Sequence, residues 1–384
     1  MPAYTARMTQ PTLKRIGDCS LATFMRRHWQ KEALLVRQAL PLVEQVVGRE
    51  ELFALAARSD VESRLVQRVR GRYTLREGPF ARAELRRMPP RDWTLLVQGV
   101  NLHVDAADAL LRRFAFIPYA RLDDLMVSYA APGGGVGPHF DSYDVFLLQA
   151  AGHRRWRYGI QDDLRLLPRA PLKILARFAP QHDEVLAPGD MLYLPPDYAH
   201  DGVATDACIT YSIGFRAPLH QELAEAFLDR LRDTIRLPGR YADPDLAPTA
   251  TPARIDRRLH RRLARALAEI RFDRDAVERF AGRYLSEPKP GVVFERPPPV
   301  SRARWRRELV RHGVRLDRRT QLLYDKARYY VNGEEGVLPA ACRAAVTALA
   351  DRRMLSSGEC ASLSPQMLGL LFDWHRHGFL TRPA

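Results

Sequence analysis

The sequence predicts an α+β protein that begins with a double-stranded β-helix, or jelly roll, continues into a helical block and ends in a small winged-helix-like domain. Short segments rich in β-branched and aromatic residues follow one another between residues 123 and 218, bounded by Gly, Pro or Asp. After residue 218, apolar residues recur every four positions, as in an amphipathic helix. The Pro-rich linker 287–300 then leads into a last segment of mixed character.

The first domain is placed at residues 1–217. Its early part, residues 20–60, is expected to be helical with one strand in ALLVRQAL (33–40). Six later segments form the strand series, and their short, regular spacing is typical of a jelly roll or barrel. They are DDLMVSYA (123–130), DVFLLQA (144–150), RRWRYGI (154–160), DEVLAPGD (183–190), DMLYLPP (190–196) and ACITYSIGF (207–215).

The second domain, 218–290, is expected to hold two amphipathic helices, around 220–235 and 255–272. Their apolar positions are Leu223, Phe227, Leu231 and Ile235 in the first, and Leu259, Leu263, Leu267 and Ile270 in the second. A small block cannot bury both stripes alone, so we expect a homodimer formed through these helices. The third domain, 291–384, is expected to combine strands, a turn at VNGEEG (331–336) and two helices.

Composition narrows the class of protein. The four cysteines are scattered without a CxxC spacing, which excludes a disulfide framework and a zinc-knuckle pattern and favours a reducing compartment. No secretory signal is recognisable, and no apolar run approaches the roughly 18 residues of a membrane span. We therefore expect a cytoplasmic protein. Of the 384 residues, 60 are Lys or Arg and 45 are Asp or Glu, a net charge of +15 that is either simply solvated or attracts a polyanion.

The stretch GPHFDS contains the first candidate metal ligands. His139 and Asp141 lie two residues apart ahead of an apolar strand, and residues i and i+2 of a strand share a face. A third candidate ligand is His200, in the loop PDYAHDG, which a jelly roll can return beside the first two. Two histidines and one carboxylate form the facial triad of non-haem Fe(II) oxygenases, with positions left open for co-substrate and O2.

Three other interpretations of these residues stay open. Single histidines near apolar strands are usually satisfied polar residues and not ligands. A cupin can hold a metal without oxidative chemistry, as in sugar isomerases or binding proteins. A zinc ion can also be purely structural.

Arg154, in GHRRW, follows a glycine turn that would return it toward the metal. A guanidinium there can hold the distal carboxylate of 2-oxoglutarate through paired hydrogen bonds. Adjacent strand residues face opposite ways, so only one of Arg154 and Arg155 can enter the site. The residues alone do not decide which, and a solvated strand edge remains the alternative.

The motifs from VSYAAPGGGVGPHFDSYDVFLLQAAGHRRWRYG through EVLAPGDMLYLPPDYAHDG to TYSIGFRAP resemble the JmjC-type bacterial ribosomal oxygenases, and among them the arginine hydroxylases of large-subunit ribosomal protein sixteen. The similarity extends over nearly the whole chain. It implies a JmjC cupin, a helical dimerisation block and a winged-helix-like domain. It also implies an Fe(II)-dependent hydroxylase that consumes 2-oxoglutarate and O2 and acts on an arginine, at C3, of a ribosomal protein.

The resemblance implies roles for individual residues. His139, Asp141 and His200 match the iron ligands, and Arg154 matches the residue that binds 2-oxoglutarate. Ser128 and Thr210 are the further co-substrate candidates, with Tyr129 and Ser212 as weaker pocket candidates. Thr210 and Ala130 stand where close relatives carry asparagine and serine, which puts the fine co-substrate contacts in question.

An arginine substrate would be recognised best by carboxylates near the site. The candidates are Asp123, Asp124, Asp144, Asp197 and Asp201, although aspartates commonly only stabilise turns. Other functions stay open beside the ribosomal one: a JmjC-type hydroxylase or demethylase of another protein, and a non-catalytic cupin and winged-helix binding protein. Direct binding of nucleic acid by the last domain is not decided by the sequence.

Overall fold

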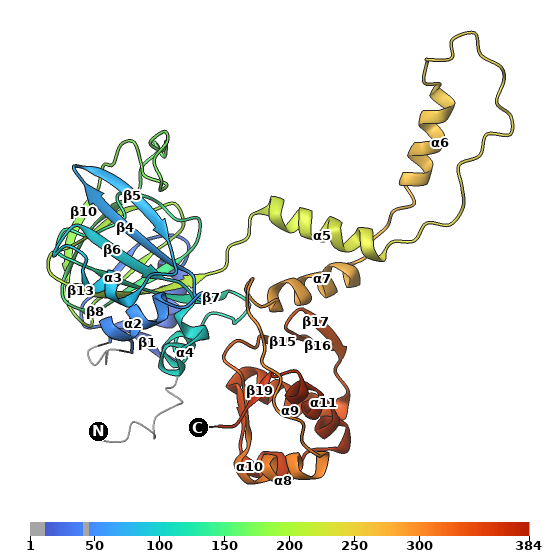
Figure 1. Ribbon diagram of the computed structural model, residues 1–384. Coiled ribbons are helices and arrows are strands. Elements are labelled where there is room, and N and C mark those ends of the chain that lie inside the picture. The colour runs from blue at the N-terminus through green and yellow to red at the C-terminus, as the bar shows by residue number, and fades with distance from the viewer. Residues whose placement is uncertain (1–11, 41–45, 384) are drawn as a thin grey trace. The chain divides into compact units, whose positions relative to one another are not determined.

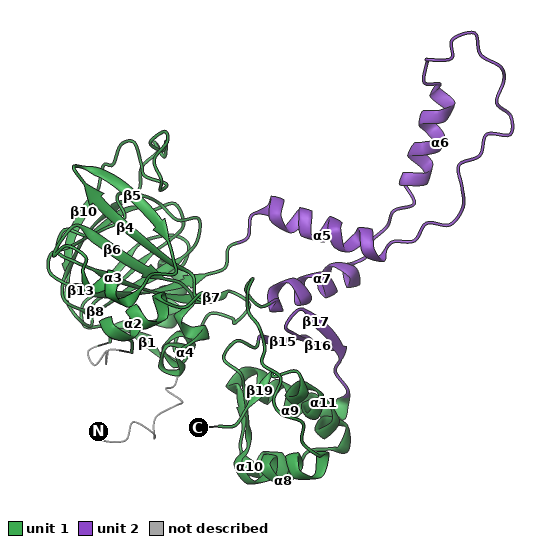
Figure 2. Ribbon diagram, viewed as in Figure 1, with its two compact units in different colours: residues 1–217, 288–320, 340–384 green, residues 218–287, 321–339 purple. Residues whose placement is uncertain are grey.

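A computed structural model describes residues 12–40 and 46–383 of the chain. They divide into two compact units (Figure 1, Figure 2). Unit 1 comprises residues 1–217, 288–320 and 340–384, and unit 2 comprises residues 218–287 and 321–339. Within the described ranges, no helix is long and apolar enough to cross a membrane.

An antiparallel sheet of eight strands forms one wall of the jelly roll, in the order β3-β11-β8-β13-β7-β6-β4-β5. Its strands are β3 (Leu34–Val36), β4 (Ser63–Val69), β5 (Arg72–Glu77), β6 (Trp93–Val97), β7 (Leu122–Ala130), β8 (Val145–Ala151), β11 (Met191–Leu194) and β13 (Cys208–Phe215). The predicted strands at 123–130, 144–150, 190–196 and 207–215 all belong to this wall. The order shows why the motifs converge: β7, β8 and β13 are far apart in sequence but adjacent in the sheet.

The opposite wall is a sheet of three strands in the order β10-β9-β12. They are β9 (Arg154–Gly159), β10 (His182–Leu186) and β12 (Ala199–Ala204). Trp156 and Tyr158 of β9 share a buried cluster with Val145 and Leu147 of β8. This cluster joins the inner faces of the two walls.

The other face of the large sheet is covered by the main apolar core. Phe146 alternates with Val145 and Leu147 and therefore points to this outer side, where its ring lies 5.4 Å from that of Phe24 and 4.9 Å from that of Tyr193. The remaining elements before β7 are β1 (Arg15–Ile16), β2 (Cys19–Ser20), α1 (Leu21–Arg27), α2 (Arg49–Ala56), α3 (Arg82–Arg86), η1 (Val100–Leu102) and α4 (Asp105–Arg112). The predicted jelly roll is thus confirmed.

Gly152 makes the turn from β8 to β9, and we expect it to be intolerant of substitution. Its φ is +60°, and a Cβ there would lie 2.2 Å from the carbonyl oxygen of Ala207. Gly71, in the β4–β5 turn, has φ +79°, but a Cβ there would meet no atom within 4 Å, so it provides a matched control. Gly71→Ala should cost about 1–2 kcal/mol of backbone strain, and Gly152→Ala about 1–3 kcal/mol more from the steric clash. Chemical denaturation measures both, and equal losses would contradict this account of the turn.

Unit 2 contains three helices and a small sheet. The helices are α5 (His220–Thr234), α6 (Arg257–Leu267) and α7 (Arg274–Ser286), and the sheet is β15 (Leu322–Tyr324), β16 (Arg328–Val331) and β17 (Glu334–Val337). The first two helices match the prediction, except that α6 ends before Ile270, and α7 was not predicted. The ring of Phe280 on α7 packs 5.2 Å from that of Phe227 on α5. The predicted turn is confirmed, with Asn332 and Gly333 at φ 50° and 85°.

The C-terminal part of unit 1 has winged-helix character. Its elements are α8 (Arg302–His312), β14 (Val314–Leu316), α9 (Ala340–Arg352), β18 (Met354–Leu355), α10 (Ser357–Ala361), α11 (Pro365–Arg376) and β19 (Leu380–Thr381). The expectation of two helices here was wrong, because this part has four, of which α10 is a single short turn capped by Ser356. Trp305, Leu309, Leu371 and Trp374 are among its buried side chains.

Candidate metal centre and co-substrate pocket

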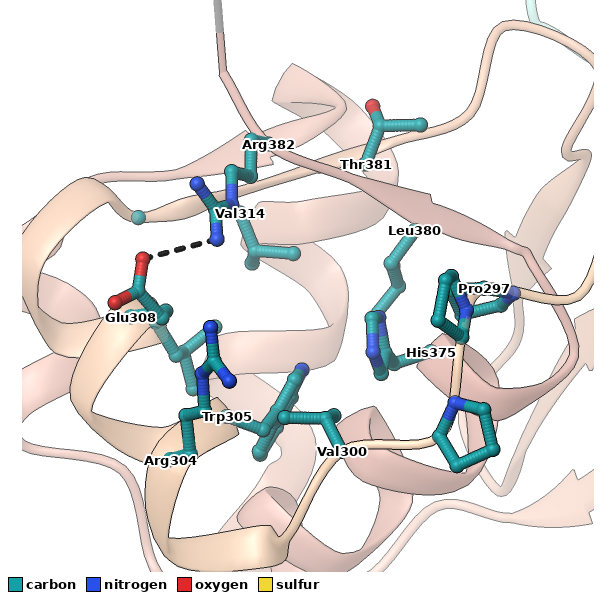
Figure 3. A pocket seen from close by; sticks show the side chains of 14 residues that line it. Pro297, Val300, Arg304, Trp305, Glu308, Val314, His375, Leu380, Thr381 and Arg382 are labelled. Atoms are coloured by element: carbon teal, nitrogen blue, oxygen red, sulfur yellow. Dashed lines mark ion pairs between the residues drawn. The ribbon is translucent and has the colours of Figure 1, made fainter.

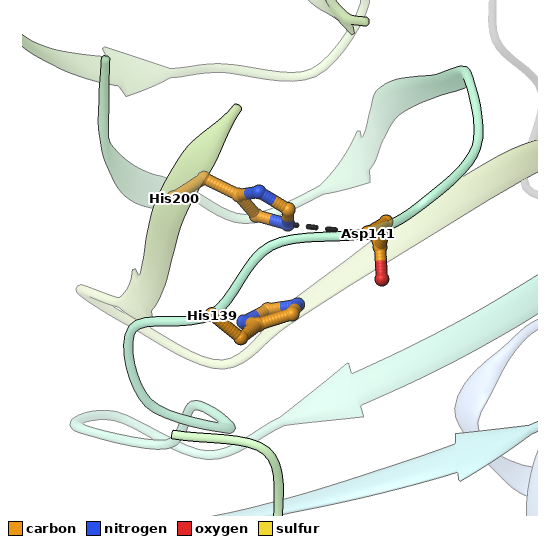
Figure 4. A group of neighbouring side chains, drawn as sticks. All are labelled: His139, Asp141 and His200. Atoms are coloured by element: carbon orange, nitrogen blue, oxygen red, sulfur yellow. Dashed lines mark ion pairs between the residues drawn. The ribbon is translucent and has the colours of Figure 1, made fainter. Parts of the chain in front are cut away.

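His139, Asp141 and His200 come together in the structure (Figure 4). One ligand atom from each lies within 4.8 Å of the others, and His200 Nε2 is 3.7 Å from Asp141 Oδ2. The expectation that His139 and Asp141 lie on a strand was wrong, since β8 begins only at Val145. A single antiparallel bridge replaces that strand: the backbone N–H of His139 donates to His200 (2.9 Å), and that of His200 donates to His139 (2.7 Å).

The loop before His139 explains the glycine run in the sequence. A Cβ on Gly134 would lie 2.2 Å from the carbonyl oxygen of Trp93, and one on Gly135 would lie 2.6 Å from that of Gly202. Only glycine allows such close backbone approach. The glycines therefore let the loop pack against β6 and β12. This packing positions His139 next to His200.

Both imidazoles are oriented for metal binding. Nδ1 of His139 donates to the carbonyl oxygen of Gly137 (2.8 Å) and Nδ1 of His200 to that of Tyr198 (2.9 Å), because a carbonyl only accepts. Each Nε2 then carries the lone pair that a metal requires. Burial, helped by His139 and opposed by Asp141, lowers the pKa of His200 to about 4, so its imidazole is neutral at physiological pH.

Arg154 lies inside the jelly roll and Arg155 outside it. The Arg154 residue is 4% exposed, and its Nη1 donates to Ser128 Oγ (3.1 Å) and Thr210 Oγ1 (3.2 Å). The Arg155 side chain is 54% exposed and pairs with Asp183. The turn through Gly152, which joins the end of β8 at Ala151 to the start of β9 at Arg154, sets this register, which the sequence left open.

The Arg154 guanidinium has no carboxylate partner in the part of the chain that the structure describes, and its Nε has no hydrogen-bond partner. A buried charge without a counter-ion is costly. The arrangement therefore fits an anionic ligand, and a carboxylate is the anion that guanidinium pairs with most effectively.

The pocket around Arg154 contains residues that sequence reasoning missed. Gln149 Oε1 accepts from Thr210 Oγ1 (3.0 Å) and so orients that hydroxyl. The indole of Trp156 lies 5.3 Å from the Arg154 guanidinium and 5.9 Å from the His200 ring, and its buried Nε1 has no partner among the described residues. Alternation along β9 from Arg154 could have found Trp156, because the two are two residues apart.

The weaker pocket candidates divide between the two faces of the sheet. Ser212 lies two residues from Thr210 on the inner face of β13, and Ala130 clusters with Ala204 and Cys208. Tyr129 faces the other way and packs against Phe53 and Trp93 in the main core. Tyr129 is therefore not a pocket residue.

Three of the five aspartates expected to contact the substrate instead make contacts within the protein. Asp144 is fully buried and accepts from Tyr193 (2.6 Å) and Gln30 (2.9 Å), so it supports the core. Asp201 alternates with His200, points away from the metal ligands and pairs with Arg157. Asp197 adopts φ 64° in the turn before β12, where its N–H donates to the Asp141 carbonyl (2.8 Å).

Asp123 and Asp124 lie on β7, the strand that carries Ser128. Asp124 is buried and accepts from Gln98 (2.8 Å) and from the N–H of Gly99 (2.8 Å). Lys289 Nζ lies 3.0 Å from Asp123 and 3.1 Å from Asp124. Burial raises the pKa of Asp124, although the Lys289 ammonium opposes that shift.

Comparison with known proteins agrees with this geometry. Residues 109–223 match the model of the JmjC domain, and residues 269–381 match that of the ROXA-like winged helix. The chain is 36% identical over 279 residues, 72% of its length, to the ribosomal protein uL16 3-hydroxylase of Escherichia coli (strain K12), of which 74% is covered. The chain belongs to the JmjC-type ribosomal oxygenases.

Other ribosomal oxygenases support the assignment. A probable ribosomal oxygenase of Haemophilus influenzae is 37% identical over 227 residues, 58% of this chain and 54% of that protein. The X-ray structure of E. coli YcfD matches with a TM-score of 0.84 at 31% identity, over 96% of this chain and all of that one. YcfD in complex with cobalt and 2-oxoglutarate matches with a TM-score of 0.81 at 32% identity, over 94% of this chain and 98% of that one.

Proposed function

We propose that this ribosomal oxygenase hydroxylates an arginine side chain, at C3, of a large-subunit ribosomal protein, with Fe(II), 2-oxoglutarate and O2. The observation that carries the proposal is the buried Arg154 guanidinium, without a carboxylate partner among the described residues, in the same jelly roll as the His-Asp-His cluster. A non-catalytic binding protein would not need a buried cation and a three-ligand site together. The E. coli relative that is named as a uL16 3-hydroxylase supports the substrate class.

The residues of this chain hold and orient the reactants. Nε2 of His139, Nε2 of His200 and a carboxylate oxygen of Asp141 would hold the metal. Arg154 would bind the distal carboxylate of 2-oxoglutarate, with the Ser128 and Thr210 hydroxyls keeping the guanidinium in place. The bound iron and 2-oxoglutarate supply the oxidising chemistry, in which 2-oxoglutarate is decarboxylated to succinate and one oxygen atom is inserted into a substrate C–H bond.

Asp123 and Asp124 remain our candidates for recognition of the substrate arginine. Asp124 and Ser128 are four residues apart on β7 and therefore face the same side of the sheet, whereas the adjacent Asp123 faces the other side and is linked to Asp124 through Lys289. The substrate guanidinium would share these carboxylates with Lys289, which contacts both, and with Arg216, whose Nε lies 3.5 Å from Asp123.

Mass spectrometry of ribosomes from cells with and without the gene tests the proposed activity. We expect an arginine-containing peptide of one large-subunit protein to be heavier by the mass of one oxygen atom only when the gene is present. Loss of methyl groups instead would indicate a demethylase, and unchanged ribosomal proteins would direct the search to another protein. Incubation of the purified enzyme and peptide with Fe(II) and 2-oxoglutarate should reproduce the same mass change.

We also propose three domains, namely a JmjC catalytic domain at 1–217, a helical dimerisation domain at 218–290 and a winged-helix-like domain at 291–384. A cytoplasmic location would follow from the ribosomal substrate. The dimer proposal is supported by apolar side chains of unit 2 that stay exposed, among them Leu228 (62%), Leu263 (46%) and Leu267 (64%). Charge adds to it, because α5 carries four carboxylates and two arginines, whereas α6 carries five arginines and no carboxylate.

Light scattering at micromolar concentration should therefore give the mass of a dimer. The double variant Leu263→Asp/Leu267→Asp should be a monomer, since two charges would be buried in the interface. Leu246→Asp is the matched control, because Leu246 is also 64% exposed but lies outside the helices. A monomeric wild-type protein would exclude the dimer.

A further inference from the structure

The positive charge of the chain is concentrated in one part of the fold. The winged-helix part, residues 288–320 and 340–384, contains 15 Lys or Arg and 6 Asp or Glu, whereas residues 1–217 contain 29 and 24. A single-sign surface of this kind attracts a polyanion when its charges are free.

Many of these arginines are free. Helix α8 carries Arg304, Arg306, Arg307 and Arg311, all of them exposed, and Glu308 is its only carboxylate. Glu308 pairs with His312 (3.6 Å) and Arg382 (3.0 Å), not with these four. Within residues 12–40 and 46–383, no carboxylate lies within ion-pair distance of the four arginines.

The same part of the fold is hollowed (Figure 3). A pocket of about 470 Å³ lies between α8, β19 and the segment Pro297–Val300, and a second of about 710 Å³ lies against the same segment and α11. Arginines line both hollows: Arg304 and Arg382 the first, Arg296 and Arg376 the second. We name these two hollows, with the segment between them, the arginine cleft.

The walls of the arginine cleft offer ring side chains as well as charge. The rings of Pro297, Pro298 and Pro299 and the His375 imidazole line both hollows, and His377 lines the second. Figure 3 shows Arg304 and Arg382 on one side of the first hollow and Pro297 and His375 on the other. Guanidinium groups that can reach phosphates, beside imidazole rings on which bases can stack, are features of single-strand nucleic-acid sites, and the proline rings add apolar contact surface.

We propose that the arginine cleft binds single-stranded RNA. The imidazoles of His375 and His377 beside the arginines favour RNA over an acidic protein, because a nucleobase can stack on them. Electrostatics also favours an RNA-rich particle as the partner. A protein of net charge +15 is repelled by a free, basic ribosomal protein but attracted to one that is bound to RNA. The binding itself does not require the hydroxylase activity, so the two proposals can fail separately.

Fluorescence anisotropy of the full-length protein with a labelled oligouridine of about 15 nucleotides tests the proposal. At low salt, the affinity of the variant Arg296→Gln/Arg304→Gln/Arg376→Gln for the RNA should be lower by a factor of about ten or more. The slope of log K against log salt should decrease in magnitude by about 2, because each phosphate that is no longer neutralised contributes about 0.7. The matched control is Arg27→Gln/Arg72→Gln/Arg87→Gln, three exposed arginines of the jelly-roll part. It removes the same charge and should change binding little.

Equal losses in the variant and the control would overturn the proposal, because binding would then depend only on net charge. Binding of polyglutamate as tightly as the RNA would also overturn the proposal, because it would indicate an acidic protein as the partner. Binding of duplex DNA more tightly than the RNA would overturn it as well. A loss confined to Arg257→Gln/Arg258→Gln/Arg261→Gln would place the RNA on α6 instead. His139→Ala should bind the RNA like the wild type, which separates this surface from the metal centre.

Discussion

Asp141→Ala is expected to abolish 2-oxoglutarate turnover while the fold stays intact. Asp141 contributes the only carboxylate of the three-residue cluster, and loss of even an outer partner of a metal ligand costs about 10–100-fold. We therefore expect activity to fall by more than about a hundredfold. The side chain is 24% exposed and outside the apolar cores, so its removal leaves no cavity.

Three measurements separate a lost metal site from an unfolded protein. Co(II) titration should show weakened binding, peptide hydroxylation should disappear, and the melting temperature of the metal-free protein should be unchanged. Asp163→Ala is the control, since that carboxylate lies on a loop and pairs with Arg165 (2.8 Å). Full activity with tight Co(II) binding in Asp141→Ala would remove Asp141 from the metal site.

Arg154→Ala is expected to raise the 2-oxoglutarate concentration needed for half-maximal turnover by about 30-fold to about 4000-fold. Removal of one partner from a buried, hydrogen-bonded charge pair costs about 2–5 kcal/mol, and about 1.4 kcal/mol is one factor of ten. The KM for the peptide should change little, because the guanidinium contacts Ser128 and Thr210 on the inner wall and not the acidic pair Asp123 and Asp124.

Arg155→Ala is the internal control for this prediction. The Arg155–Asp183 pair is exposed, and such pairs contribute about 0–1 kcal/mol. Succinate or 2-oxoglutarate should raise the melting temperature of the wild type and of Arg155→Ala, but not that of Arg154→Ala. Sensitivity of Arg155→Ala in place of Arg154→Ala would mean that β9 is shifted by one residue from the register seen here.

The sequence by itself determined the features that depend on neighbouring residues. Strand segments, the helices at α5 and α6 and the Asn332–Gly333 turn follow from local periodicity and from glycine's tolerance of positive φ. His139, Asp141 and His200 could be singled out because their spacing and the glycine run form a specific motif. Arg154 could be proposed but not chosen over Arg155.

Only the tertiary structure decided what depends on pairing across the chain. The β8–β9 turn and the β9–β12 register turned Arg154 inward, and the bridge between His139 and His200 replaced the predicted strand. Hydrogen bonds from Tyr193 and Gln30 hold Asp144 in the core, and Tyr129 lies on the outer face of the sheet, where it packs against Trp93. These outcomes depend on register and burial, which are set by contacts between residues far apart in sequence and are therefore not encoded in local patterns.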